Sequence, residues 1–397
     1  MPIEITTMPS ATRAGIRKAL RIPPENRALQ IGRYEGQFGE VFMDTPPAVT
    51  LSAANAASTI ASPLSIPAVV DGAPSARFAY WSGEVDLAGA SFPADAGLKN
   101  TALHVPNGNT YPLYEFFHFG RYVDLQILGQ GAPAQVYIND EATVADVADI
   151  QPPADGNFYR IVIDFGSIGF RKIGFRTGNW FFGATVSITD TLTATSKAGV
   201  GRMVAIGDSF TEGTGAEVEY LGFPGLLRIP LGLDIWISGS GGTGYLNEGP
   251  FGRVNFRGRI EEDCLQYNPD YVMIAGGIND GSYPVADIVA EAELLYDQIL
   301  AALPGVTLIV ISPFWPHGPP PSNITDLAAA LKDPVESRGG IYIDFIAPPL
   351  VTGTGNAGAP TGDGNADYIT SADNTHPTPL GHEVYASCIY QKLASLI

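Results

Sequence analysis

Apolar and polar residues alternate along the chain between about residues 75 and 195. Five segments show this alternation, with turn residues between them: 121–129, 134–140, 158–165, 171–178 and 184–195. A period of two residues is typical of strands that bury one face. Several such strands at a spacing of roughly ten residues predict an all-β sandwich that resembles a jelly roll.

The pattern changes after the segment TSKAGVG at 195–201. Short apolar runs now alternate with segments of helical periodicity. The apolar runs are RMVAIG, LDIWIS, YVMIAGG, VTLIVIS and IYIDFI, and the helical segments lie near 217–229, 256–267, 284–302, 322–337 and 379–396. Five buried strands separated by helices predict an α/β fold with a doubly wound parallel sheet.

The length of 397 residues exceeds the roughly 250–300 residues at which single cores stop growing. Together with the change of pattern, this length predicts three parts. They are an N-terminal arm at 1–45, a β-sandwich domain at 46–197 and an α/β domain at 198–397.

The charge limits the classes of partner. The formal net charge is −19, which disfavours nucleic acid and anionic membrane surfaces. No apolar segment predicts a membrane span, and the N-terminal sequence lacks the apolar region of a signal peptide. We therefore expect a soluble protein, while its compartment and its oligomeric state remain open.

The cysteines and histidines do not predict a metal site. Cys264 and Cys388 are far apart in sequence, and no Cys-x-x-Cys motif or Cys/His cluster occurs. Free thiols and a single disulfide both remain open. We expect His382 to support the last helix, and the other three histidines outside the candidate site to be ordinary hydrogen-bonded side chains: His104, His118 and His317.

Candidate chemistry follows the ends of the predicted parallel strands. The first strand runs into VAIGDSFTEG at 204–213, the second into SGSGGTGY at 238–245, and the third into GGIND at 276–280. The segment DNTHPTPLGH at 373–382 follows the fifth strand. Ligands of doubly wound sheets bind outside the carboxyl ends of the strands, so these loops are expected to meet at one edge.

A serine after a strand is most often a helix cap, but the other loops favour a nucleophile. Ser209 requires a base within hydrogen-bond reach, and His376 with Asp373 three residues before it can supply the base and its orienting carboxylate. Acyl transfer also needs donors for the oxyanion. The N–H of Ser209, a glycine N–H near Gly242 and the side chain of Asn279 are candidates.

Four segments together resemble a known family. GDSFTEG, GGTGY, GGIND and DNTHP are similar, in this order, to blocks I, II, III and V of the SGNH (GDSL) hydrolases, over about residues 200–397. The resemblance implies a flavodoxin-like, three-layer α/β/α domain with a five-stranded parallel sheet. It implies a serine esterase that needs no metal or cofactor, with Ser209 as nucleophile, His376 as base and Asp373 as its orienter.

The same resemblance implies an oxyanion hole formed by Ser209, a block II glycine and Asn279. Gly242 is the predicted glycine, and its neighbour Gly241 is an alternative. Block II usually starts from an asparagine near the strand end, where this chain has Ile237 and Ser238, and this departure leaves the register of the loop open.

Two other motifs are disfavoured. The serine does not lie in a Gly-x-Ser-x-Gly elbow, because Thr211 occupies the last position, and this argues against an α/β-hydrolase fold. The segment GSGGTG at 239–244 fits a dinucleotide fingerprint in its letters. It follows the second strand, however, and does not open a helix, so we do not expect a nucleotide cofactor.

Several features bear on the substrate. Asp208, Tyr245, Tyr283 and Trp315 lie next to predicted strand ends and are expected to contact substrate. The aromatic runs at 111–122 and 179–183 fit either core strands of the sandwich or a surface that stacks on sugars.

A sandwich next to an SGNH domain resembles carbohydrate deacetylases. This architecture predicts an acetylesterase that removes a short acyl group from a carbohydrate. A general short-chain or lipid esterase is the alternative within the same class. From a different class, the chain fits a glycan-binding structural protein with a secondary hydrolase domain.

Overall fold

The structure is a computed structural model that describes residues 47–87, 98–101, 112–139, 141–142, 150–216 and 219–394. The described residues form two compact units that join in sequence between Gly199 and Val200. The predicted arm at 1–45 and His104 lie outside the described residues. The predicted domain boundaries stay predictions.

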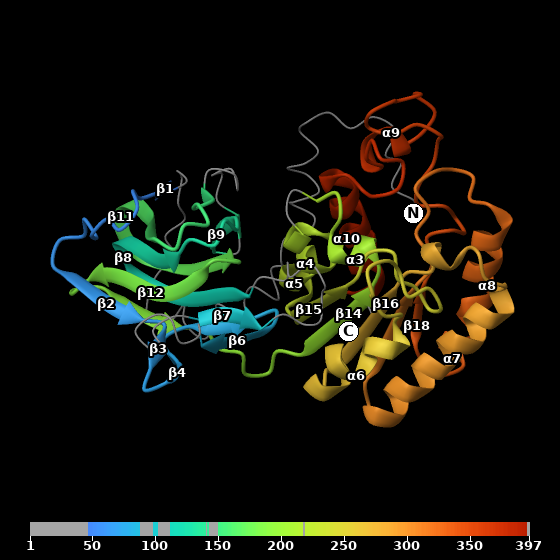
Figure 1. The fold of residues 1–397 in the computed structure, drawn as a ribbon, viewed down its shortest axis with the longest axis horizontal. Helices are drawn as coiled ribbons and strands as arrows, with labels where there is room; N and C mark the ends of the chain where they lie inside the picture. Colours follow the sequence, from blue (N-terminus) through green and yellow to red (C-terminus); the bar gives the residue numbers. More distant parts are fainter. Residues whose placement is uncertain are drawn as a thin grey trace. The chain divides into compact units, whose positions relative to one another are not determined.

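The unit up to Gly199 consists of antiparallel strands (Figure 1). Among the described residues, eleven strands form one sheet, and β3 (Val69–Val70) pairs separately with β4 (Ala73–Pro74). The strands of the large sheet are β1 (Ala48–Leu51), β2 (Pro63–Pro67), β5 (Ala79–Trp81), β6 (Glu84–Leu87), β7 (Leu98–Thr101), β8 (Leu113–Leu128), β9 (Ala134–Ile138), β10 (Glu141–Ala142), β11 (Phe158–Thr177), β12 (Trp180–Ser187) and β13 (Thr191–Ala194). The predicted all-β part of the fold is confirmed.

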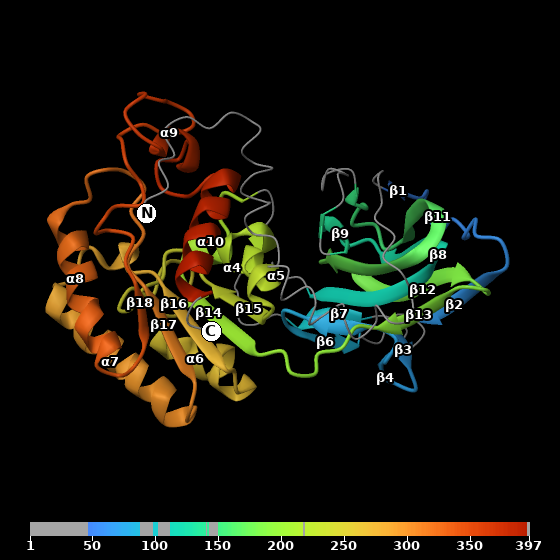
Figure 2. The same cartoon turned by 180° about the vertical axis from the view of Figure 1, so that it is seen from behind.

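Strands β8 and β11 are long and pair along most of their length (Figure 2). The pairing is interrupted between Asp164 and Gly169, where a β-bulge bends β11. The second half of β8 also pairs with β12, and the first half pairs with β5 and β13. The sequence predicted separate strands at 158–165 and 171–178, but the residues between them form this bulge and not a turn, so one strand results.

The core of this unit contains three aromatic side chains from the two aromatic runs. Tyr114, Phe116 and Phe181 have no exposed surface, and Tyr114 packs against Phe181 with ring centroids 4.5 Å apart. Phe119 has 36% of its surface exposed, and the other described aromatic residues of the runs are half-buried: Phe117, Tyr122, Trp180 and Phe182. These runs therefore contribute to the core in part and also present aromatic side chains outside it.

The unit from Val200 onward contains a five-stranded parallel sheet. Its strands are β14 (Arg202–Gly207), β15 (Asp234–Gly239), β16 (Tyr271–Ala275), β17 (Thr307–Ile311) and β18 (Ile341–Ile343). Their order is β15-β14-β16-β17-β18, which is the flavodoxin-like arrangement. The predicted fold class is confirmed, and the end of β14 lies at the point where the strand order reverses.

Helices cover both faces of this sheet (Figures 1 and 2). Met203 and Ala205 of β14 face a core with α4 (Phe223–Leu226) and α10 (Pro379–Leu393). Val204 and Ile206 face the opposite core, with α6 (Ile260–Asp263), α7 (Val285–Ala302) and α8 (Ser322–Glu336). Because both faces are buried, the strand residues are apolar without alternation.

Two predicted helices are broken into short turns. The segment 217–229 contains η2 (Glu219–Leu221) and α4, followed by α5 (Arg228–Leu231). Gly222, Pro224 and Pro230 interrupt a continuous helix there. The segment 256–267 divides into η3 (Arg257–Arg259), α6 and η4 (Leu265–Tyr267), because Cys264 has non-helical backbone angles.

Cys264 and Cys388 are both free thiols. Among the described residues, no helix combines the length and the apolar character that crossing a membrane requires.

Candidate active site

Ser209 is the first residue of the short helix α3 (Ser209–Glu212), directly after β14. Asp208 caps this helix, because its Oδ1 accepts the N–H of Phe210 at 3.0 Å. A Cβ atom on Gly207 would lie 2.1 Å from Thr211 Oγ1 and 2.3 Å from the carbonyl oxygen of Ala275. The strand can therefore turn into α3 at this point because residue 207 is glycine.

The structure brings Ser209, His376 and Asp373 together. His376 Nε2 lies 2.8 Å from Ser209 Oγ, and His376 Nδ1 lies 2.6 Å from Asp373 Oδ2. The histidine thus lies between a hydroxyl group and a carboxylate, with one ring nitrogen facing each. This is the arrangement in which an imidazole can take a proton from a serine.

Asp373 is held as a carboxylate. Partial burial alone would raise its pKa, but hydrogen bonds keep the pKa well below its usual range. The donors are the hydroxyl of Ser371 at 2.6 Å, the N–H of Thr375 at 2.9 Å, the N–H of His376 at 3.0 Å and the His376 ring. An ionised Asp373 accepts the Nδ1 proton, so Nε2 is left as the acceptor for the Ser209 hydroxyl.

The loop that holds Asp373 and His376 is closed on itself. The N–H of Ser371 donates to the carbonyl oxygen of His376 at 2.8 Å, and Thr370 forms a β-bridge with Pro377. His317 Nε2 contacts the carbonyl oxygen of Asn374 at 3.1 Å. These bonds fix the position of the loop after α9 (Ala366–Ile369).

Three candidate oxyanion donors lie on separate elements. As the first residue of α3, Ser209 has an N–H without an intrahelical acceptor. Among the described residues, the N–H of Gly242 has no hydrogen-bond acceptor, whereas that of Gly241 donates to Glu212 Oε2 at 2.8 Å. Asn279 uses one side-chain N–H on the carbonyl oxygen of Thr243 at 2.9 Å, which leaves the second for a ligand.

The sequence comparison identifies the family. Residues 205–384 match the GDSL-like Lipase/Acylhydrolase family. The C-terminal unit is a GDSL-like lipase/acylhydrolase domain. This domain belongs to a family of acyl-ester hydrolases, and the resemblance read from the four segments is confirmed. A comparison with curated protein sequences gave no match.

Solved structures resemble the chain beyond the GDSL-like domain. A family two carbohydrate esterase from Cellvibrio japonicus has a TM-score of 0.60 at 14% identity, covering 84% of this chain and 98% of that one. The salicylyl-acyltransferase SsfX3 from a tetracycline biosynthetic pathway has a TM-score of 0.58 at 16% identity, with coverage of 84% and 98%. An active-site mutant of a family two carbohydrate esterase from Clostridium thermocellum has a TM-score of 0.56 at 14% identity, with coverage of 80% and 98%. At these identities the likeness shows a shared fold.

The residues predicted to contact substrate fall into two groups. Tyr245 is fully buried, and its hydroxyl bonds to that of Tyr296 at 3.0 Å, so it belongs to the core. Asp208 is also fully buried, and burial raises its pKa to about 7. Both predictions of substrate contact are therefore wrong, because neither side chain reaches the surface. Tyr283 is exposed and Trp315 is half-buried, so they stay candidates.

Sequence reasoning missed a buried polar cluster behind the serine. Arg259 donates to the carbonyl oxygens of Gly207 at 2.7 Å and Ser238 at 3.1 Å, and its Nε lies 3.1 Å from Asp263. This cluster ties the ends of β14 and β15 together. An arginine in a segment predicted to be helical gave no signal for this role.

Asp280 is a second residue that sequence reasoning missed. Its carboxylate accepts the N–H groups of Tyr245, Leu246 and Asn247, each at 2.9 Å. It thereby fixes the loop after β15 next to Asn279. Its position beside Asn279 in the segment GGIND was a signal that could have found it.

The other described histidines have structural hydrogen bonds. His382 Nδ1 accepts the N–H of Phe223 at 3.2 Å, and its Nε2 lies 3.0 Å from the carbonyl oxygen of Thr214. His118 lies 3.2 Å from Asp190 in the core of the β unit. Among the described residues, no group of three or more His, Cys, Asp or Glu side chains is placed to hold a metal ion.

Proposed function

We propose that the protein is a serine esterase that removes short acyl groups, and acetyl groups first of all, from a carbohydrate. The observation that supports it most is the chain of contacts from Ser209 through His376 to Asp373, at 2.8 and 2.6 Å. The family of the C-terminal domain limits the chemistry to acyl esters.

In the proposed reaction, Ser209 Oγ attacks the ester carbonyl while His376 Nε2 takes the hydroxyl proton. The tetrahedral intermediate collapses, the protonated imidazole returns the proton to the leaving alcohol, and an acyl-enzyme remains. Water, deprotonated by the same nitrogen, then attacks the acyl-enzyme and releases the acid. The Asp373 carboxylate stabilises the imidazolium ion in both steps.

The oxyanion of this intermediate is bound by the N–H of Ser209, the N–H of Gly242 and the side chain of Asn279. We assign Gly242 and not Gly241 because Glu212 already takes the N–H of Gly241. The oxygen of Gly241 accepts a hydrogen bond from Arg253. In a trans peptide the carbonyl and the following N–H point in opposite directions, so Arg253 holds the N–H of Gly242 on the side away from itself.

The size of the acyl group is inferred from the core behind the serine. Phe210 and Phe314 are buried and stack with ring centroids 4.8 Å apart. Phe210 also lies 5.7 Å from the His376 ring. These rings fill the space on the core side of the site, and this supports a short acyl group. The carbohydrate part of the proposal rests on the shared fold with family two carbohydrate esterases.

The test measures acid release from acetylated oligosaccharides and from 4-nitrophenyl esters of rising chain length. Ser209→Ala should abolish release, while Ser337→Ala, an exposed serine near the end of α8, should match the wild type. Acetate release from the sugar with steeply falling rates on longer chains supports the proposal. Activity confined to longer or aryl esters would contradict the carbohydrate substrate and indicate a general esterase. An active Ser209→Ala variant would refute the mechanism.

A further inference from the structure

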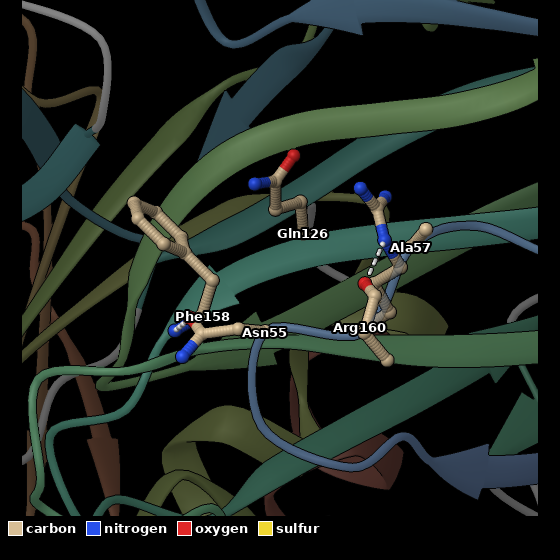
Figure 3. Close-up of a pocket in the computed structure, with 6 residues that line it drawn as sticks. Asn55, Ala57, Gln126, Phe158 and Arg160 are labelled. Carbon is tan, nitrogen blue, oxygen red and sulfur yellow. Dashed lines mark hydrogen bonds between the residues drawn. The ribbon is translucent and has the colours of Figure 1, made fainter.

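The β unit contains a pocket of about 300 Å³. It lies over the face of the sheet where β8 and β11 pair, and the loop that follows β1 forms its rim (Figure 3). The lining residues are Asn55, Ala56, Ala57, Gln126, Phe158 and Arg160. All of them belong to this unit, and the GDSL-like domain contributes none of the lining.

The rim is held rigidly against β11. The N–H of Asn55 donates to the carbonyl oxygen of Phe158 at 2.7 Å, and Asn55 Oδ1 accepts the N–H of Phe158 at 3.1 Å. The side-chain amide of Asn55 also donates to Asn157 Oδ1 at 2.8 Å. Because three hydrogen bonds fix this residue, the pocket is already formed without a ligand.

The floor presents three different side chains that point the same way. Gln126 and Arg160 are direct cross-strand partners, and Phe158 lies two residues before Arg160 on the same face. Figure 3 shows the Phe158 ring, the Gln126 amide and the Arg160 guanidinium all projecting away from their strands. The edge-to-face contact of Phe158 with Phe182, at a centroid distance of 4.8 Å, fixes the ring.

Two of these groups keep unused hydrogen-bonding capacity. Arg160 donates from Nε to the carbonyl oxygen of Ala56 at 3.1 Å and from Nη1 to Thr185 Oγ1 at 3.2 Å. Among the described residues, Arg160 Nη2 has no acceptor and the Gln126 amide has no partner. The pocket therefore offers a ligand the guanidinium group of Arg160, which two hydrogen bonds hold in place, and the N–H donors and the oxygen acceptor of the Gln126 amide.

A carboxyl group lies near Arg160. Asp124 is fully buried two residues before Gln126 on β8, opposite Thr185 of β12, whose hydroxyl accepts the hydrogen bond of Arg160. Burial raises the pKa of Asp124, and the charge of Arg160 acts in the opposite direction. An anionic ligand beside Arg160 would therefore also lie near this carboxyl group.

We propose that this pocket binds one ring of a neutral saccharide. An aromatic face suits the C–H face of a pyranose, and the free donors and acceptors suit hydroxyl groups, each of which both donates and accepts. The carboxyl group of Asp124 near Arg160 favours a neutral ligand over an anionic sugar. This inference concerns a second site, in the β unit, and does not depend on the proposed reaction at Ser209.

The experiment is calorimetric titration of the full-length Ser209→Ala protein with cellohexaose, xylohexaose and, as an anionic probe, hexagalacturonic acid. We expect a neutral hexasaccharide to bind and the anionic one not to bind. Phe158→Ala should weaken binding by roughly tenfold, and Gln126→Ala should weaken it less. Phe119→Ala, an exposed phenylalanine on β8 outside the pocket, is the matched control.

A thermal melt of each variant separates loss of binding from loss of the fold, and Gln126→Ala breaks no hydrogen bond of the described residues. In a crystal of the full chain soaked with the bound hexasaccharide, a sugar ring should lie against Phe158. The proposal is overturned if no neutral probe binds at millimolar concentration, if hexagalacturonic acid binds best, or if the pocket variants bind like Phe119→Ala. With active Ser209, the pocket variants should hydrolyse 4-nitrophenyl acetate at the wild-type rate, so a failure here is distinct from a failure of the esterase proposal.

Discussion

The two units place their polar groups by different backbone structures. In the GDSL-like domain, Ser209, Asn279 and His376 lie on loops or short turns outside the sheet. In the β unit, Gln126 and Arg160 are neighbours within paired strands. Loops bring together residues that are distant in sequence, while a sheet face fixes the spacing of side chains that are neighbours in its strands. The first arrangement suits a reaction, and the second suits recognition of a rigid ligand.

This contrast predicts that turnover depends on the GDSL-like domain alone. Asp373→Asn is the sharpest case, because an amide no longer stabilises the imidazolium ion or selects the Nδ1–H tautomer. We expect kcat to fall by about 10⁴-fold, measured with an acetyl ester under saturating conditions. Asp326→Asn, an exposed position on α8, is the matched control. A variant with more than a tenth of the wild-type rate would contradict the role of Asp373.

We expect a smaller loss of turnover than for Asp373→Asn when Arg253 is replaced, because Arg253 acts on the reaction only by positioning a backbone N–H. Arg253→Met removes the hydrogen bond to the oxygen of Gly241 and frees the peptide that carries the Gly242 N–H. We expect kcat to fall by about 10- to 100-fold with little change in KM. Asn279→Ala removes a direct donor and should cost about 10²- to 10³-fold.

The ratio of these two effects tests the assignment of the donors. If Arg253→Met raises KM and leaves kcat unchanged, Arg253 contacts the substrate and does not position the oxyanion donor. If Arg253→Met lowers kcat more than Asn279→Ala does, this would also contradict a role of Arg253 that is limited to positioning the Gly242 N–H.

The smallest effect concerns stability and compares the buried carboxyl group of Asp208 with an exposed carboxyl group of the same domain. The pKa of Asp208 is raised from 3.8 to about 7, chiefly by burial and also by the charge of Asp280. The N–H of Phe210 and the charge of Arg259 act in the opposite direction. Between these pH values the folded state keeps a proton that the unfolded state releases, so stability falls as the pH rises and levels off above about pH 7.

Asp208→Asn should remove this part of the pH dependence and still cap α3 through its amide oxygen. We expect its Tm to exceed that of the wild type progressively from about pH 4 to pH 7, by roughly 2–4 °C for each kcal/mol gained. Calorimetric melts across this range measure the difference, with the exposed Asp333→Asn as control. A constant offset at all pH values would show that the carboxyl does not titrate in this interval.

The parts of the molecule that the sequence predicted share a physical basis. Apolar runs of β14 to β17 stand out because both of their faces are buried, and parallel strands necessarily end at one edge. The meeting of Ser209 and His376 followed from that rule together with four ordered motifs. Whether these residues catalyse the reaction stays a prediction, and so does the oxyanion role of Gly242.

Other features could not be predicted because they depend on register or on long-range packing. The pocket requires Gln126 to lie opposite Arg160, and the sequence of one strand alone does not determine its pairing register with another. The burial of Tyr245 follows from its contact with Tyr296, 51 residues later. The inward turn of Arg259 depends on carbonyl groups at the ends of two strands, which the helical pattern of its own segment does not reveal.

The loop from Ser371 to Pro377 carries both Asp373 and His376, whereas Ser209 belongs to a different element. A displacement of this loop as a rigid body preserves the 2.6 Å contact between His376 and Asp373 and changes the 2.8 Å contact between His376 and Ser209. The base therefore stays oriented and ready whether or not it is engaged with the nucleophile. A contact that displaces this loop therefore alters the proton transfer from Ser209 to His376 without disturbing the pairing of His376 with Asp373.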